Sequence, residues 1–336
     1  MKAAFYDAVG GTDVLRLGEL PEPQPEPGEV RVRIAASGIN PVDIKRRRGR
    51  TLHRAGARPV QLFDRTIPHD DGAGTIDAVG EGVDPARVGE RVWVRMAQTL
   101  GRPFGTAAQW CCVPAAFAVT LPETVALHEG AALGVNAVTA HYAVHCDGPL
   151  REDATVVVQG ATSGVGRYAV QLAREAGATV IATAGSEGNR ELASKLGAHH
   201  VFDHQDPDLV AKVRELTGGR GVDVVVEVEF GINWANDAEM LAEDAAISVF
   251  GSDRKLEFEF EPYALCAGNH RVHFIGVYWI AQAAAQAAVD DIGRMLAEGR
   301  LENLVTERLP LDRIAEAHDR TEKPSATAVK VVLDVD

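Results

Sequence analysis

One short stretch of this chain restricts its fold more than any other. Residues 156–166 read VVVQGATSGVG, a β-branched run that ends at a loop of small residues. The next stretch, Arg167–Ala176, has the apolar spacing of a helix that buries one face, and a second β-branched run follows at Thr179–Gly185. The segment Thr155–Gly185 therefore predicts one βαβ unit of about 30 residues.

The loop in this unit has the composition of an anion-binding turn. The first N–H groups of a helix have no partner within the helix, and the helix dipole adds positive potential there, so a pyrophosphate suits this place. The small residues leave its approach open: Ala161, Ser163, Gly164 and Gly166. The G-x-G-x-x-G pattern is only partly kept, because alanine and serine stand at its first two glycines. Dinucleotide binding and an ordinary βα turn are both consistent with this loop.

The rest of the chain divides into two parts with different patterns of strand-like and helical runs. Up to about Pro122, short strand-like runs separated by Gly and Pro predict a mostly β, barrel-like domain. Beyond Thr124, strand-like runs alternate with helical ones, which predicts a doubly wound parallel sheet. The strands expected there are 155–159, 179–184, 200–202, 222–228 and 246–251, and the helices between them 167–176, 189–196, 208–216 and 236–242.

The last part of the chain needs a place in one of these domains. It offers a strand-like run at His273–Trp279, an alanine-rich helix at Ala281–Ala297 and a final strand at Lys330–Asp334. No linker or internal repeat separates it from the rest, so we expect it to return to the first domain. The expected domains are 1–124 with 278–336, and 125–277.

Charge and hydropathy exclude several classes of protein. The net charge is -14, from 34 Lys and Arg against 48 Asp and Glu, which argues against a general affinity for nucleic acid or an anionic membrane. No window approaches the ~18 apolar residues of a membrane span, and the N-terminus lacks the pattern of a signal peptide. We therefore expect a soluble, cytoplasmic protein that does not insert into a membrane.

Two local features stand out against this background. KRRRGR at Lys45–Arg50 is a cationic run that is typical of a solvated surface, with attraction of an anionic substrate as the alternative. The four cysteines, at 111, 112, 146 and 266, match neither a metal knuckle nor a disulfide framework, so we expect reduced, largely packed thiols.

A set of motifs in order along the chain resembles a known family. The motifs are ASGINPVD at 36–43, HDDGAGTIDAVGEGV at 69–83, VGERV at 88–92, GATSGVG at 160–166, GAHHVFDH at 197–204, LTGGRGVDVVVE at 216–227 and PLDRIAEAH at 310–318. Together they resemble the zinc-independent quinone oxidoreductases of the medium-chain dehydrogenase/reductase superfamily, and the zeta-crystallin-like members especially. The resemblance implies an α/β fold, with a GroES-like β-barrel domain and a Rossmann domain with a doubly wound parallel sheet.

The resemblance also bears on metals. The positions that hold catalytic zinc in zinc-dependent relatives align with Ser37, Asp70 and Val135, which are poor ligands as a set, and the four-cysteine lobe for structural zinc is absent. His69, Asp70 and Asp71 are interpreted as a turn with solvated carboxylates rather than as a metal site. The sequence therefore predicts no metal.

The cofactor that the resemblance implies is a nicotinamide dinucleotide. An acid that binds the ribose of NAD usually follows the glycine turn by about 20 residues, but the strand tip here is neutral and Arg190 is available to a 2′-phosphate, which favours NADPH. Glu187 argues mildly for NADH. The cofactor-binding residues that we expect are Thr139, Ala161, Thr162, Ser163, Gly164, Val165, Gly166, Gly185, Ser186, Arg190, His204, Phe250, Gly251, Ser252, Val277 and Tyr278.

Several of these residues have a second interpretation. His204 could be a surface loop histidine and Gly251 the turn after a strand. Tyr278 and Trp279 could line a flat substrate pocket or plug the interface between the domains, and we favour the interface.

The implied activity is hydride transfer from NADPH to a quinone or a similar conjugated carbonyl without metal. Asn40 is expected to orient the substrate or the nicotinamide, and Asp43 to act as a structural or proton-network carboxylate, although both also suit a helix-initiating turn. Relatives often carry tyrosines just after this motif, where this chain has Lys45 and Thr51, and that leaves the substrate class open.

Two alternatives come from the same resemblance. One is reduction of the carbon–carbon double bond of an alkenal or enone, and the other is a non-catalytic zeta-crystallin-like protein that binds a nucleotide or RNA. RNA binding conflicts with the acidic charge. A homodimer is also implied, with 273–279 as a candidate edge strand.

Overall fold

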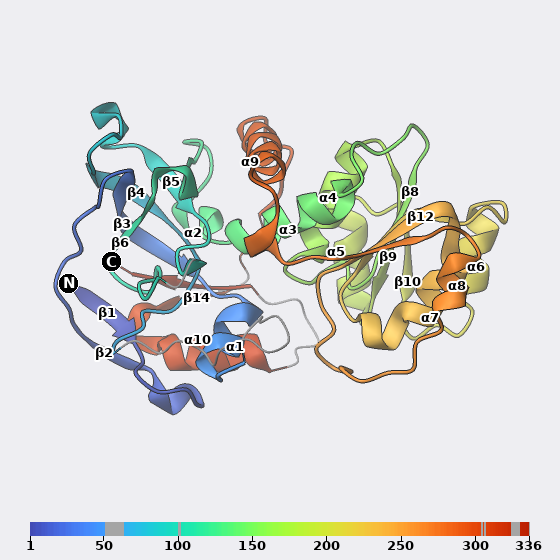
Figure 1. The fold of residues 1–336 in the computed structure, drawn as a ribbon, viewed down its shortest axis with the longest axis horizontal. Helices are drawn as coiled ribbons and strands as arrows, with labels where there is room; N and C mark the ends of the chain where they lie inside the picture. The colour runs from blue at the N-terminus through green and yellow to red at the C-terminus, as the bar shows by residue number, and fades with distance from the viewer. Residues whose placement is uncertain (51–63, 100–101, 304, 306, 324–329, 336) are drawn as a thin grey trace. The chain divides into compact units, whose positions relative to one another are not determined.

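The computed structural model describes residues 1–50, 64–99, 102–303, 305, 307–323 and 330–335. The chain forms two compact units (Figure 1). One consists of Met1–Val135 with most of the described chain from Val289 onward, and the other of Asn136–Ala288. The domain boundaries drawn from the sequence, at 124/125 and 277/278, lie earlier in the chain than these and stay a prediction.

The second unit is built around a six-stranded parallel sheet. Its strand order is β10-β9-β8-β11-β12-β13, so the order reverses between β8 and β11. This is the arrangement of a Rossmann fold, in which ligands bind beyond the carboxyl ends of the strands near the reversal. The strands are β8 (Thr155–Val158), β9 (Thr179–Ala184), β10 (His200–Asp203), β11 (Val222–Glu227), β12 (Leu241–Val249) and β13 (Arg271–Phe274).

Helices connect these strands and pack against the sheet. The alternation that predicted the doubly wound sheet is confirmed, because a helix follows each of the first four strands. The helices of this unit are α3 (Gly134–His145), α4 (Gly166–Glu175), α5 (Glu187–Lys195), α6 (Leu209–Leu216), α7 (Phe230–Met240) and α8 (Pro262–Cys266). β-Branched residues make up β8 and most of β11, and all four residues of β8 are buried.

The first unit contains a seven-stranded sheet whose pairing runs as an open path, β14-β15-β3-β4-β5-β7, with β6 on β3. Among the described residues no strand pairing closes this path into a ring, although the GroES-like architecture itself is as expected. A two-stranded sheet adds β1 (Lys2–Phe5) and β2 (Arg16–Glu19). The other strands are β3 (Glu29–Gly38), β4 (Asp71–Val79), β5 (Arg91–Val94), β6 (Trp110–Pro114), β7 (Ala118–Thr120), β14 (Glu307–Pro310) and β15 (Val331–Asp334).

The end of the chain completes this unit. Strand β15 pairs with β3, and helix α10 (Ile314–Glu322) lies beside α1 (Pro41–Arg47), although the two helices are far apart in the sequence (Figure 1). The return of the C-terminal segment to the first sheet is therefore as expected. The remaining helices are α2 (Leu127–Gly130) and α9 (Gln282–Ala297), and short 3₁₀ turns lie at 12–14, 85–87, 115–117, 277–279 and 311–313.

Several predicted elements differ from the structure, among them the strand expected at 246–251, which is β12 and begins at Leu241. The run 273–279 is not one strand, because β13 ends at Phe274 and Val277–Trp279 forms a 3₁₀ turn after Gly276. Helix α7 begins at Phe230 rather than Asn236, because Phe230 is buried in the core of this unit and fixes the first turn despite poor helix formers beside it. In the part of the chain that the structure describes, no helix is long and apolar enough to cross a membrane.

Candidate functional site

The loop between β8 and α4 is held in one tight conformation. Gly160 has a positive φ of 64°, and the hydroxyl of Ser163 accepts a hydrogen bond from the N–H of Gly166 at 3.0 Å. A Cβ on Gly166 would lie 3.0 Å from Cα of Ala161 and closer still to the carbonyl oxygen of Gly160. Glycine at 166 therefore lets the helix start pack directly against the strand end.

The same loop presents unused hydrogen-bond donors. Among the described residues, the backbone N–H groups of Thr162, Gly164 and Val165 meet no acceptor, whereas those of Gly160 and Ala161 bind the side chain and carbonyl of Thr183. Three unpaired N–H groups at a helix start form a cradle for an anion. A Cβ on Gly164 would lie 2.7 Å from Oδ1 of Asn136, so a larger residue at this position would require the side chain of Asn136 to move.

A buried arginine supports the loop from beneath. Arg167 is 1% exposed, and its guanidinium donates to the carbonyl oxygens of Thr162 at 3.1 Å and Ser163 at 3.3 Å. These bonds turn the carbonyls inward, so the opposite side of the loop is left to the N–H groups. Desolvation lowers the pKa of Arg167, but guanidinium stays charged at neutral pH.

A second group of expected residues gathers at the ends of β9 and β10. The imidazole of His204 lies against Gly185, where a Cβ would be 2.9 Å from its Cε1. The side chain of Ser186 caps α5 by accepting from the N–H of Asn189, and Arg190 on α5 is bound to Asp203 at 2.9 Å. The structure thus brings Gly185, Arg190 and His204 together, and it adds Asp203, which was quoted in a motif but was not expected to pair with Arg190.

The remaining expected cofactor residues are placed as follows. Phe250 donates its N–H to the carbonyl of Glu227, and the hydroxyl of Ser252 accepts from the N–H of Gly231, which ties the loop after β12 to the start of α7. Gly251 lies in the turn after β12, and a Cβ added at this position would meet the backbone of Val228. Thr139 is buried on α3, and Val277 and Tyr278 lie on the 3₁₀ turn. Cofactor contacts at these positions stay a prediction.

A buried pair of carboxyl groups lies below the loop and was missed in the sequence. Glu227 ends β11 and Asp237 lies on α7, and both are fully buried. Glu227 accepts from the N–H of Glu229 and from Nδ2 of Asn233, which stabilises its charge, while burial and the neighbouring Glu227 raise the pKa of Asp237 well above its ordinary value. Asp237 therefore carries the proton that the two groups share.

This carboxyl pair connects to the cofactor loop through two side chains. Nε2 of Gln159 donates to Asp237 at 2.8 Å, and the hydroxyl of Thr183 donates to Oε1 of Gln159 at 2.7 Å and accepts from the N–H of Gly160. The sequence gives one signal for this carboxyl pair, the acidic residue that follows VDVVV. The pairing of that residue with Asp237 on α7 depends on tertiary structure.

In the other unit, Asn40 and Asp43 form the first turn of α1. The N–H of Asn40 donates to Oδ2 of Asp43 at 2.8 Å, as expected for a helix-initiating turn. The amide of Asn40 also donates to Asp71 at 2.7 Å and accepts from Nζ of Lys330 at 2.8 Å. Asn40 therefore joins Asp71 to Lys330 in a fully buried polar chain, and its predicted part in catalysis stays a prediction.

The interpretation of residues 69–71 as a turn with solvated carboxylates is wrong. His69, Asp70 and Asp71 are each 0% exposed. Asp71 accepts from the N–H of Val135 at 2.9 Å and from Asn40, and burial raises its pKa to about 7 although Lys330 and Asn40 lower it. The sequence could not show this burial, because Asn40, Val135 and Lys330 are far from Asp71 in the chain. They come close to it only when the sheet forms and the C-terminal segment returns to it.

The cationic run is only partly a solvated surface, because Arg48–Arg50 are exposed but Arg47 is buried. Arg46 binds Asp70 at 2.5 Å, and Arg47, which is 0% exposed, binds Glu322 of α10 at 3.1 Å. Arg48 pairs with the same glutamate. The helical period turns these arginines toward acids that lie close only in the folded chain. Thr51, which was compared with a family tyrosine, lies outside the described residues.

The positions that align with catalytic zinc ligands do not fit a zinc ion. The hydroxyl of Ser37 is bonded to Nδ1 of His69 and to Thr106, both at 2.8 Å. Asp70 already faces the guanidinium of Arg46, a fixed cation, and Val135 offers no ligand atom in its side chain. No reaction step is assigned to a metal at this place.

Comparison with known proteins agrees with the fold and the loop. Residues 26–123 match the model of the alcohol dehydrogenase GroES-like domain, and residues 164–294 match that of the zinc-binding dehydrogenase. A quinone oxidoreductase of Rattus norvegicus is 30% identical over 335 residues, which cover 99% of this chain and 97% of the relative.

Solved structures give the same result. A structure described as an NAD-dependent alcohol dehydrogenase superposes with a TM-score of 0.88 at 30% identity, covering 100% of both chains. Mycobacterial Rv1454c, solved in complex with NADPH, gives a TM-score of 0.84 at 26% identity, covering 99% of both chains. The Rossmann strand order, the glycine loop and these matches agree. The chain therefore belongs to the quinone oxidoreductase family of the medium-chain dehydrogenase/reductase superfamily and is an oxidoreductase.

Proposed function

We propose that this protein is an NADPH-dependent quinone reductase that uses no metal in catalysis. The observation that carries the proposal is the loop 160–166, whose unpaired N–H groups at Thr162, Gly164 and Val165 suit the pyrophosphate of a dinucleotide. The quinone oxidoreductase relative and the NADPH complex of the mycobacterial protein support the substrate and the cofactor.

The residues near β9 and β10 support NADPH over NADH. The tip of β9 is neutral, and the guanidinium of Arg190, a third exposed, and the imidazole of His204 lie where the ribose of a bound dinucleotide is expected. Asp203 holds Arg190 in place but also offsets part of its charge. The proposed preference is therefore one of degree, and the similarity to an NAD-dependent enzyme sets the opposite expectation.

The chemistry required of the protein is modest. NADPH supplies the hydride when bound. The loop 160–166 positions the dinucleotide, Arg167 and Thr183 keep that loop rigid, and donors near the substrate stabilise charge on its oxygen. Asn40 is the proposed orienting amide and Asp43 the proposed proton-network carboxylate, whose pKa is raised by burial and by the nearby Asp70.

One experiment separates the candidate functions. Purified protein is titrated with NADPH and NADH by nicotinamide fluorescence, and oxidation of NADPH is then followed with 1,4-benzoquinone, 9,10-phenanthrenequinone and a 2-alkenal. Rapid turnover with the quinones is expected. Turnover with the alkenal alone would move the activity to double-bond reduction, and binding without any turnover would leave a nucleotide-binding protein.

The roles of Asn40 and Asp43 have their own test. Asp43→Asn keeps an acceptor for the N–H of Asn40, so the turn of α1 should persist. A proton-network role predicts a lower kcat with quinone at an unchanged affinity for NADPH. Loss of NADPH affinity and thermal stability together, with kcat preserved in the remaining folded protein, would instead assign Asp43 a structural role alone.

A further inference from the structure

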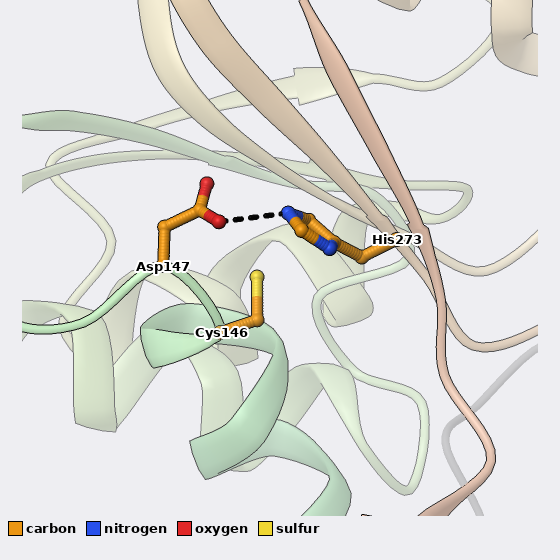
Figure 2. A group of neighbouring side chains, drawn as sticks. All are labelled: Cys146, Asp147 and His273. Carbon is orange, nitrogen blue, oxygen red and sulfur yellow. Dashed lines mark ion pairs between the residues drawn. The ribbon is translucent and has the colours of Figure 1, made fainter.

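A thiol, a carboxylate and an imidazole meet within the nucleotide-binding unit, away from the loop described above. Cys146 and Asp147 follow the last residue of α3, and His273 lies on β13. One ligand atom from each side chain lies within 4.8 Å of the other two, and Nε2 of His273 is 2.9 Å from Oδ1 of Asp147. Figure 2 shows the three side chains pointing toward one another from these two elements.

The chemistry of this donor set differs from that of an ordinary surface ion pair. Sulfur, imidazole nitrogen and carboxylate oxygen are the three ligand types that Zn²⁺ takes in proteins, and a thiolate selects against Mg²⁺ and Ca²⁺. We propose that Cys146, Asp147 and His273 bind a thiophilic divalent metal ion, of which Zn²⁺ is the best matched.

The spacing is close to what a tetrahedral ion needs. Bonds of 2.0–2.3 Å place tetrahedral ligand atoms about 3.4 Å apart. The observed distances, 2.9 Å between His273 and Asp147 and no more than 4.8 Å for any pair, bracket this value. Side-chain rotations can adjust these distances, because none of the three residues is fully buried.

The surroundings hold two of the ligands in orientation. Oδ2 of Asp147 accepts from Nε of Arg271 at 2.9 Å, which leaves Oδ1 for the ion, and Sγ of Cys146 lies 3.2 Å from the hydroxyl of Ser248. A serine hydroxyl that donates to a thiolate and an arginine that fixes a carboxylate are typical outer partners of metal ligands. Such partners raise the affinity of a site and define which atom faces the ion.

His273 itself is incompletely satisfied. Its Nε2 is buried and, although it is near Asp147, it forms no hydrogen bond of acceptable geometry with any residue that the structure describes. A buried ring nitrogen without a good partner costs free energy unless something binds it. An ion between the imidazole and Oδ1 of Asp147 would satisfy both atoms.

Binding has a defined proton balance. A cysteine binds a metal ion as the thiolate, whereas an ordinary free thiol is protonated at neutral pH. Formation of the metal–sulfur bond releases that proton to solvent, and no electron is transferred. Affinity should therefore rise with pH.

The consequence for the fold is a link between α3 and β13. Strand β13 is the outermost strand of the parallel sheet, and among the described strands it pairs with β12 alone. An ion held by residues at the end of α3 and on β13 would fix this edge. The three ligands do not coincide with Ser37, Asp70 or Val135, and the inference does not depend on the proposed quinone reductase activity.

The test uses the whole chain after removal of metal with a chelator. Co²⁺ is added as a spectroscopic probe, and the expected result is binding of one ion per chain, with a thiolate-to-cobalt charge-transfer band and the intense visible bands of tetrahedral cobalt. Zn²⁺ should then displace Co²⁺ and raise the melting temperature. The affinity for Co²⁺ should increase from mildly acidic to neutral pH.

Variants assign the ligands. Cys146→Ser and His273→Gln should each weaken binding by about a hundredfold or more and remove the charge-transfer band or the tetrahedral bands. Cys266→Ser is the matched control, since Cys266 is the exposed cysteine of the same unit, and it should change nothing. The inference is overturned if the unaltered protein binds no Co²⁺ at micromolar concentrations, or if Cys146→Ser keeps the spectrum while Cys266→Ser loses it.

Discussion

The guanidinium of Arg190 on α5 and the carboxylate of Asp203 at the end of β10 form an ion pair of 2.9 Å. Arg190 is 33% exposed and Asp203 41%, so both groups remain accessible to a bound molecule. His204 lies beside them against Gly185. The pair therefore combines the cation that a 2′-phosphate requires with an acid that competes for it.

We expect Arg190→Ala to lower the affinity for NADPH by roughly tenfold to a hundredfold and to leave that for NADH nearly unchanged, because a charge-assisted hydrogen bond is lost only with NADPH. Asp203→Asn should act in the opposite direction, since it releases Arg190. Nicotinamide fluorescence titrations measure both affinities. Lys195→Ala, on the same helix, is the control for a general loss of positive charge. An equal loss of both nucleotides in Arg190→Ala would contradict the proposed role.

The close packing at Gly166 predicts a strong effect of a single methyl group. Gly166→Ala places a Cβ against backbone atoms of Gly160 and Ala161, which have no freedom to rotate away. We expect a loss of about 1–3 kcal/mol in the free energy of unfolding and at least a tenfold weaker binding of nucleotide. Denaturant unfolding and fluorescence titration measure the two effects.

A glycine on the next helix gives the matched control for this substitution. A Cβ on Gly188 would meet nothing within 4 Å, and the residue lies inside α5. Gly188→Ala should therefore stabilise the protein by about 0.5–1 kcal/mol, because alanine is the better helix former. If Gly166→Ala behaved like Gly188→Ala, the loop would be looser than described.

These residues also show how far the sequence could lead. The βαβ unit around 155–185 was predictable because β-branched runs, a small-residue turn and an amphipathic stretch are local signals, and the strands of the structure agree with them. Arg190 was expected from its place just after the neutral tip of the second strand, whereas Gly185 and His204 were expected from the family resemblance, and the structure brings the three together.

The errors have a common physical origin. The buried state of Asp70 and Asp71, and the burial of Arg47 against Glu322, depend on partners that the fold brings together from distant parts of the chain. A charged residue in a sequence is most often exposed, so without its partner the solvated interpretation is the natural one. The ligand atoms of Cys146, Asp147 and His273 meet for the same reason only in the folded chain.

A buried pair of histidines ties the stability of the first unit to pH. His69 and His318 are 0% exposed, their Nε2 atoms are 2.9 Å apart, and the rings stack at 5.1 Å. Burial, followed by the nearby Arg47, lowers the pKa of His318 to about 3, and burial lowers that of His69 as well. Both rings are therefore neutral in the folded protein.

The sign of the pH dependence follows from this neutrality. Below the ordinary histidine pKa of about 6.5 the unfolded chain binds more protons than the folded one, so the free energy of unfolding falls as the pH decreases toward 3. For His318 the loss is about 3 kcal/mol by pH 4. His318→Gln, which cannot titrate, should lose less stability over this range. The free energy of unfolding of both proteins is measured by denaturant unfolding at several pH values. If it fell equally with pH in both proteins, the neutral histidine pair would be contradicted.

The carboxyl pair of Glu227 and Asp237 predicts the opposite trend. Asp237 is protonated in the folded protein and ionised in the unfolded chain above about pH 4, so the folded state binds the extra proton and stability falls as pH rises through this range.

Asp237→Asn removes the titration, while its amide can donate to Glu227 and accept from Gln159 as the protonated acid does. We expect this variant to approach or exceed the native stability at neutral pH and to show a shallower decline with pH. Asp237→Ala, which removes the acceptor of Nε2 of Gln159 in the core, should cost about 2–4 kcal/mol. Guanidinium unfolding at several pH values measures all three proteins, and a steeper decline in Asp237→Asn than in the native chain would show that Asp237 is ionised in the fold.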